Sequence, residues 1–257
     1  MKMHGPWTLR VQCWNGRRQA PAAPEWSHPS PAQNACEQNH SSQPEPFSSR
    51  WQLLSHSQTQ SIEKSSLPEY DGDNGESKKA DFALSFSPRY PQVKERYDAL
   101  RVPGQERPSL SQMSDECTSK LGLYLGAEVK KAGERENVAQ GQLFTWLGSG
   151  IIKARKLRAA ATASGKPAQR DIMPLLGWTV VGYEWKLYVA FGAWDSPEDT
   201  IRIVGPIPGI PNSTESLIDV FKMLQLVECI KQWVSEEYWP WFRDDVMKAL
   251  ERWDTDT

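Results

Sequence analysis

Three charged residues lie in strand-like apolar segments, where their types and spacing could do chemistry. Asp81 lies in KKADFALSF, and Glu128 and Lys130 lie in YLGAEVKKAG. Side chains alternate faces along an extended strand, so Glu128 and Lys130 point the same way. A carboxylate among apolar residues is costly unless it is solvated, paired or bound to a cation. The pattern therefore leaves two interpretations, a solvated ion pair at a strand end and one half of a metal site.

If the two strands are neighbours, Asp81 and Glu128 converge on one hard divalent cation. Mg²⁺ suits this arrangement, because it prefers carboxylate, carbonyl and water oxygens as ligands. The carbonyl of Val129 would be an additional ligand. Lys130 would lie near the attacking water or the transition-state phosphate, where its charge offsets developing negative charge. The competing interpretation is a surface ion pair worth roughly 0–1 kcal/mol.

The periodicity of the apolar residues predicts the elements that must position these groups. We expect an α/β (α+β) chain with a mixed sheet flanked by helices, because strands precede and follow a long helix. The connection over 87–115 is polar and contains proline, and Tyr183–Glu184 is the expected hairpin turn. The predicted strands are 78–86, 121–130, 174–183, 186–193 and 200–207, and the predicted helices are 134–162, one capped at Asn212 and broken at Pro240, and 242–252.

Residues 1–48 are rich in Pro, Ser, Gln and Asn and are predicted to be a disordered tail, because such a composition buries too little apolar surface. Residues 49–257 are the predicted domain, with a possible short helix around Trp51. Zinc binding in the tail is an alternative to incidental residues, although the spacing fits no usual finger. The four candidate ligands are Cys13, His28, Cys36 and His40.

The composition narrows the classes of function. A formal net charge of −2 gives no whole-protein attraction to nucleic acid or membranes, so an anionic partner needs a local patch. We expect no membrane span, since no apolar run is long enough. Four scattered cysteines favour an intracellular location, with the nucleus as a candidate compartment. All four histidines precede residue 57, so a catalytic site built from later residues must use carboxylates, lysines or a metal held by oxygen.

At these residues the chain resembles the PD-(D/E)xK nuclease superfamily, and more closely the fungal PD-(D/E)xK nuclease-like domain proteins. The resemblance is carried by SKKADFAL, GAEVKK, AQGQLFTW, WTVVGYEWKLYVAFG and EEYWPWF, within roughly residues 50–250. It implies a restriction-endonuclease-like fold, Mg²⁺ or Mn²⁺ as cofactor, and nucleic acid as partner, DNA rather than RNA. The implied activity is phosphodiester hydrolysis, and the alternative is an inactive nuclease-fold scaffold that binds nucleic acid or protein.

Carried over position by position, the resemblance makes Asp81 and Glu128 the acidic metal ligands and Lys130 the motif lysine. Gln142 matches the glutamine on the following helix, and Trp146, four residues later, shares its helix face. Ala80 replaces the motif proline. Members often have a further glutamate on an earlier helix, for which Glu63 is the best candidate.

Two further groups have competing interpretations. A basic cluster on the long helix either contacts the phosphate backbone or is a solvated helix face. It consists of Lys153, Arg155, Lys156 and Arg158. The late tryptophans either stack on bases or, as we favour, fill the core.

Overall fold

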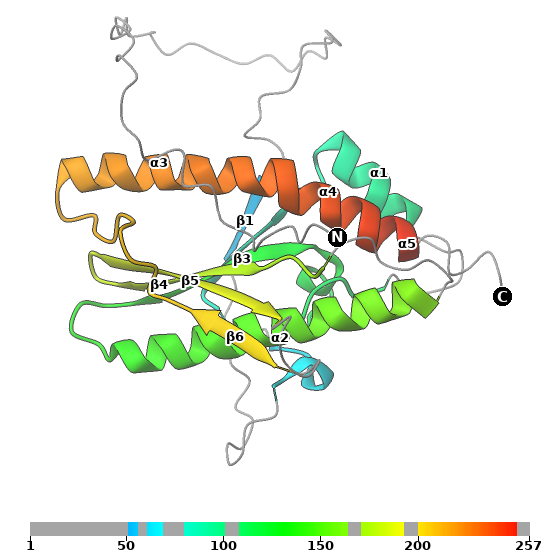
Figure 1. Ribbon diagram of the computed structural model, residues 1–257, viewed down its shortest axis with the longest axis horizontal. Helices are drawn as coiled ribbons and strands as arrows, with labels where there is room; N and C mark the ends of the chain where they lie inside the picture. Colours follow the sequence, from blue (N-terminus) through cyan, green and yellow to red (C-terminus); the bar gives the residue numbers. More distant parts are fainter. Residues whose placement is uncertain are drawn as a thin grey trace, which may run out of the picture. The chain divides into compact units, whose positions relative to one another are not determined.

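The computed structural model describes residues 51–55, 61–68, 80–100, 108–163, 171–192 and 200–250 (Figure 1). All of them belong to one compact unit, Pro46–Thr257. The predicted tail over 1–48 lies outside the described residues, as do the zinc candidates within it. No helix among the described residues is both long enough and apolar enough to cross a membrane.

A six-stranded sheet forms the centre of this unit, and its strands lie side by side in chain order. β3 and β4 are parallel, whereas every other neighbouring pair is antiparallel. This arrangement confirms the predicted mixed sheet and α+β class. The strands are β1 (Trp51–Ser55), β2 (Phe82–Phe86), β3 (Leu123–Lys130), β4 (Leu175–Val181), β5 (Glu184–Gly192) and β6 (Ile201–Val204).

Helices flank the sheet in two layers (Figure 1). The long helix α2 makes the crossover that joins the parallel strands and lies along one face, and α3 lies along the other. The helices are α1 (Pro91–Ala99), α2 (Glu136–Ala163), α3 (Leu217–Trp233), α4 (Trp239–Trp241) and α5 (Lys248–Leu250), with short 3-10 turns η3 (Lys64–Ser66) and η4 (Thr118–Lys120) and π-helical η5 (Val234–Tyr238) and η6 (Phe242–Met247).

Two glycines allow α2 to lie very close to the sheet. Gly126 on β3 and Gly177 on β4 are register partners. A Cβ atom at Gly126 would come within 2.7 Å of the Trp146 ring, and one at Gly177 within 2.9 Å of Leu143. Trp146 and Leu143 are fully buried there. At these two glycines the side chains of Trp146 and Leu143 therefore rest directly on the backbone of β3 and β4, which fixes how close α2 lies to the strand that carries Glu128.

Aromatic side chains from the C-terminal helical run pack against the end of β2 and the start of β3. Ring centroids lie 4.6 Å apart for Phe86 and Trp239, and 6.1 Å apart for Tyr124 and Tyr238. Trp178, Trp239 and Trp241 are at most 6% exposed. The core interpretation of these tryptophans is confirmed, whereas Trp194 lies outside the described residues.

Two predicted elements near the N-terminal half were wrong. The short helix expected around Trp51 is strand β1, because its whole length pairs with β2. The connection predicted over 87–115 contains α1, which begins at Pro91, a favourable first position for proline. Val93 and Tyr97, one turn apart, bury its inner face. Its low apolar content concealed this spacing.

Three local signals in the C-terminal half were also misread. The β4–β5 turn is Gly182–Tyr183, where Gly182 has a positive φ of 59°, and Glu184 already pairs with Val181. The cap of α3 is Ser216, not Asn212; its Oγ accepts the backbone N–H of Asp219. The helical run also continues through Pro240. π-helical turns stand on both sides of this proline, where wider turns relieve the clash of its ring with the preceding turn.

Candidate active site

Strand register brings four polar residues into one row across the sheet. Phe82 pairs with Ala127, so Asp81, one residue before β2, stands beside Glu128. Glu128 pairs with Thr179 on β4, and Thr179 pairs with Lys186 on β5. Glu128 is two residues from Gly126, so the row is on the face that α2 covers. The prediction that Asp81 lies inside the strand was wrong, because it precedes β2 at a bend.

The structure brings Asp81, Glu128 and Lys130 together. The Nζ atom of Lys130 is 2.5 Å from Oε1 of Glu128 and 4.0 Å from Oδ2 of Asp81. The backbone N–H of Val129 donates to the same Asp81 oxygen at 2.8 Å. Since one ammonium reaches both carboxylates, their two oxygens are at most about 6.5 Å apart, the sum of the two distances. Both carboxylates thus face one cationic position, which Lys130 takes.

The two carboxylates differ in their exposure to solvent. Glu128 is only 1% exposed, and burial raises its pKa to about 7 although the hydrogen bond from Lys130 acts to lower it. The Asp81 side chain is 45% exposed. Burial acts to lower the pKa of Lys130, but its hydrogen bond to Glu128 and the charges of Glu128 and Asp81 raise it overall. A buried carboxyl therefore lies beside an accessible one, with a protonated lysine between them.

Gln142 and Trp146 lie on α2 above this row. Trp146 packs on Gly126 and is fully buried, so it is a core residue. α2 runs back over β3, and Gln142 is one turn nearer the start of α2 than Trp146. It therefore faces the level of Glu128, two residues beyond Gly126. Its Oε1 is buried, with no hydrogen-bond partner among the described residues.

The donor atoms at this position suit a hard divalent cation. Oε1 of Glu128 and Oδ2 of Asp81 both face the ammonium of Lys130, and carboxylate oxygens are ligands for Mg²⁺ or Mn²⁺. Within the described ranges, no group of three or more His, Cys, Asp and Glu side chains could hold a metal. The oxygens of Asp81 and Glu128 fit such a cation as two carboxylate ligands, and backbone carbonyl or water oxygens would complete its coordination.

The basic cluster lies elsewhere and has internal partners. Lys153 is 11 residues beyond Gln142, about 16 Å along the helix axis at 1.5 Å per residue. It is buried and pairs with Glu63 at 3.1 Å. Glu63 is therefore not brought to the carboxylates. The remaining partners are the Thr200 carbonyl for Arg155, the Ser65 carbonyl for Lys156 and Asp171 for Arg158. Phosphate contact by these four residues stays a prediction.

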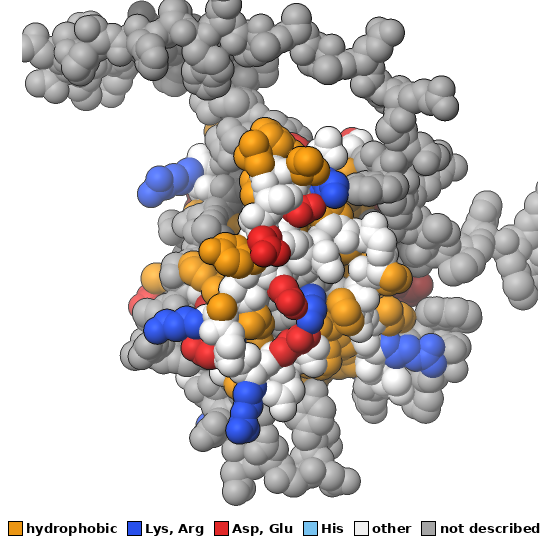
Figure 2. Space-filling model, turned by 90° about the vertical axis from the view of Figure 1, so that its left-hand side faces the viewer, with side chains coloured by type: hydrophobic (Ala, Val, Ile, Leu, Met, Phe, Trp, Pro, Cys, Tyr) orange, Lys and Arg blue, Asp and Glu red, His pale blue; other side chains and the backbone are white. Residues whose placement is uncertain are grey.

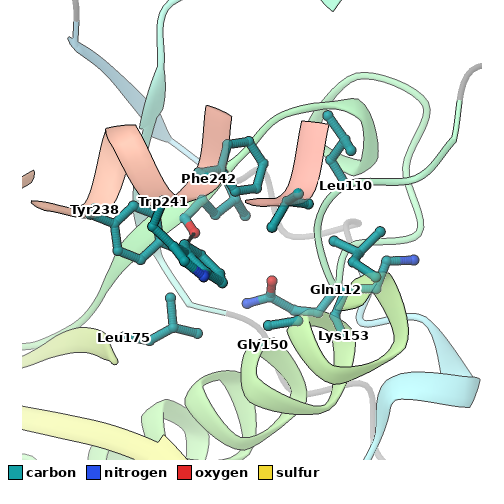
Figure 3. A pocket seen from close by; sticks show the side chains of 12 residues that line it. Leu110, Gln112, Gly150, Lys153, Leu175, Tyr238, Trp241 and Phe242 are labelled. Carbon is teal, nitrogen blue, oxygen red and sulfur yellow. Dashed lines mark hydrogen bonds between the residues drawn. The ribbon is translucent and has the colours of Figure 1, made fainter. Parts of the chain in front are cut away.

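A small cavity lies between α2 and the C-terminal helical run (Figure 3). Its volume is about 20 Å³, room for about one water, and Gln112, Lys153 and Trp241 are among the residues that line it. A space of that size has no room for a nucleotide, and none of the residues of the polar row lines it. By contrast, acidic side chains gather with lysine or arginine between them at the end of the molecule seen in Figure 2, where β3 leads into α2.

Two residues of the polar row, Thr179 and Lys186, were missed by sequence reasoning. Thr179 is fully buried, and it is the single polar side chain of the strand LLGWTVV, a signal that could have revealed it. Lys186 donates to Glu136 in the first turn of α2 at 2.7 Å, and this hydrogen bond raises its pKa. The sequence shows the alternation of polar Lys186 with apolar Leu187, but it does not show that Glu136 is the partner of Lys186.

The fold and the convergence of Asp81, Glu128 and Lys130 define a restriction-endonuclease-like protein. The family model of the PD-(D/E)XK nuclease superfamily matches residues 32–239, most of the chain, and the chain therefore belongs to that superfamily. No curated protein and no solved structure matches it. The match begins within the predicted tail, so the boundary at residue 49 stays a prediction.

Proposed function

We propose that this protein is a metal-dependent nuclease that hydrolyses phosphodiester bonds of nucleic acid. The observation that carries the proposal is that the ammonium of Lys130 reaches both carboxylates, that of Asp81 just before β2 and that of Glu128 on β3. Membership of the nuclease superfamily supports the same conclusion.

Asp81, Glu128 and the carbonyl of Val129 would hold Mg²⁺ or Mn²⁺. When bound, the ion supplies Lewis-acid stabilisation of the phosphoryl oxygens and lowers the pKa of an attacking water. Glu128 acts as the buried ligand and Asp81 as the accessible one. Lys130 then turns its ammonium from Glu128 toward the water or the phosphate, donating a hydrogen bond where negative charge develops. Gln142 contributes its amide above Glu128 as a contact to substrate or water.

The proposed partner is DNA rather than RNA, in line with the family resemblance. The basic residues of the second half of α2 are candidate contacts to the phosphate backbone. An intracellular location remains part of this proposal and rests on the four scattered cysteines.

Lys130→Ala tests the proposal directly. We expect the wild-type protein to cleave DNA with Mg²⁺ or Mn²⁺ but not in EDTA, and Lys130→Ala to lose about 100-fold or more of the rate, the usual scale for such electrostatic groups. Lys131→Ala is the matched control, because Lys131 is the adjacent lysine and is exposed. Circular dichroism checks that both variants fold. Cleavage that survives Lys130→Ala, or that proceeds equally in EDTA, contradicts the mechanism.

A scaffold without catalytic activity is the second candidate. It is favoured by one observation, that Lys130 itself occupies the position between the carboxylates, where it can replace a metal. Calorimetric titration with Mg²⁺ and Mn²⁺ separates the two functions. If the wild-type protein binds Mg²⁺ or Mn²⁺ and Asp81→Asn abolishes this binding, the result supports the nuclease. A protein that neither binds these ions nor cleaves nucleic acid supports the scaffold.

A further inference from the structure

Thr179 on β4 has a hydroxyl group that is buried on the sheet face covered by α2. Its side chain is 0% exposed, and its Oγ1 has no hydrogen-bond partner among the described residues. A buried hydroxyl without a hydrogen bond costs about 1–3 kcal/mol, and valine would fill the same space in this apolar strand without that cost. The position of this hydroxyl therefore calls for a hydrogen-bond acceptor on a neighbouring element.

The residue opposite Thr179 on β3 is Glu128, whose carboxylate can accept a hydrogen bond. Glu128 and Thr179 are partners in the parallel β3–β4 pair, and residues opposite one another on adjacent strands present their side chains on the same face. The second oxygen of that carboxylate, Oε2, is also buried and without a partner in the described part of the chain. An unused donor and an unused acceptor thus stand on neighbouring strands, under the helix that excludes water from both.

We propose that Thr179 is a positioning residue of the metal site: its hydroxyl donates to Oε2 of Glu128 and holds Oε1 toward the cation. Lys130 already defines the direction in which Oε1 points. A carboxylate held at one oxygen presents the other in a fixed orientation, and such supporting hydrogen bonds govern metal affinity. A χ1 rotation of Thr179 suffices to change the direction of its hydroxyl. The role in metal binding rests on the proposed function, whereas the hydroxyl–carboxylate contact does not.

Two measurements test the inference on the full-length protein. The first is a double-mutant cycle of Thr179→Val and Glu128→Met, followed by urea unfolding in EDTA. We expect Thr179→Val to shift the unfolding midpoint in the wild-type background and to have a clearly different effect when Glu128 is absent. Ser85→Ala is the matched control, because its buried hydroxyl on β2 also lacks a partner but lies beside Leu123, away from Glu128. Its shift should add to that of Glu128→Met.

The second measurement is the affinity for Mn²⁺ by calorimetry. Thr179→Val should weaken it about tenfold or more, the scale for residues that orient a metal ligand, and Thr179→Ser should stay within about threefold of wild type. Additive midpoint shifts, or an unchanged affinity in Thr179→Val, overturn the inference. A wild-type protein that takes up no Mn²⁺ overturns the proposed function instead, while the cycle in EDTA still decides whether hydroxyl and carboxylate interact.

Discussion

Replacing Glu128 with glutamine should stabilise the metal-free protein at alkaline pH. Burial raises the pKa of Glu128 from 4.5 to about 7. Between these values the folded protein binds more protons than the unfolded chain, so the free energy of unfolding decreases as the pH rises. The loss is complete above about pH 7. At 1.36 kcal/mol per pKa unit, it amounts to about 3 kcal/mol.

Glutamine keeps the shape of Glu128 and removes the charge. Lys130 is not left alone in the variant, because Asp81 stays 4.0 Å from its ammonium. We therefore expect the variant to exceed wild type by about 1–3 kcal/mol near pH 8.5 in EDTA, and by much less near pH 5, where the buried carboxyl is protonated. Urea unfolding of both proteins at the two pH values gives the comparison.

Two results would refute the reasoning. A variant that is less stable than wild type near pH 8.5 would mean that the pair with Lys130 outweighs the cost of burial. A difference that does not change with pH would mean that Glu128 is not the titrating group. Unfolding in the presence of Mg²⁺ gives an independent test. Binding of the ion to the folded state should raise the unfolding free energy of wild type, and should raise that of the variant far less.

The remaining predictions concern the elements that hold the site. Gly126→Ala should lower the unfolding free energy by about 1–3 kcal/mol, since its Cβ would meet the Trp146 ring at 2.7 Å; urea unfolding measures it, and an unchanged midpoint would show that α2 can shift freely. Ser216→Ala should cost about 1 kcal/mol by removing the cap on Asp219, measured by thermal unfolding, whereas Ser216→Gly should cost only a few tenths.

The part of the site that depends on local geometry was predictable from sequence. Alternation along one strand places Glu128 and Lys130 on the same face, and their 2.5 Å contact agrees with it. Asp81 required knowledge of strand pairing, which the resemblance supplied and composition did not. Thr179 needed the register of β3 with β4, because the partner of a polar residue on a neighbouring parallel strand is not encoded by any local pattern.

Residues that satisfy one another over long sequence distances were the least predictable. The basic cluster has a helical spacing that shows which positions share a face, but not that Lys153 would be neutralised by Glu63, 90 residues earlier. Proline usually ends or kinks an α-helix, so the sequence predicted a break at Pro240. The helical run continues because π-helical turns stand on both sides of this proline.

The chain order of the six strands has a consequence for how the protein is made. Every strand pairs with the strand before or after it in sequence, so sheet growth needs no later segment to insert between earlier ones. Asp81, Glu128, Lys130 and Gln142 are all present once α2 has been synthesised. A nascent chain can therefore pair β2, which follows Asp81, with β3, which carries Glu128, before residues 217–250 emerge. The last helices then close over a sheet whose order is already set.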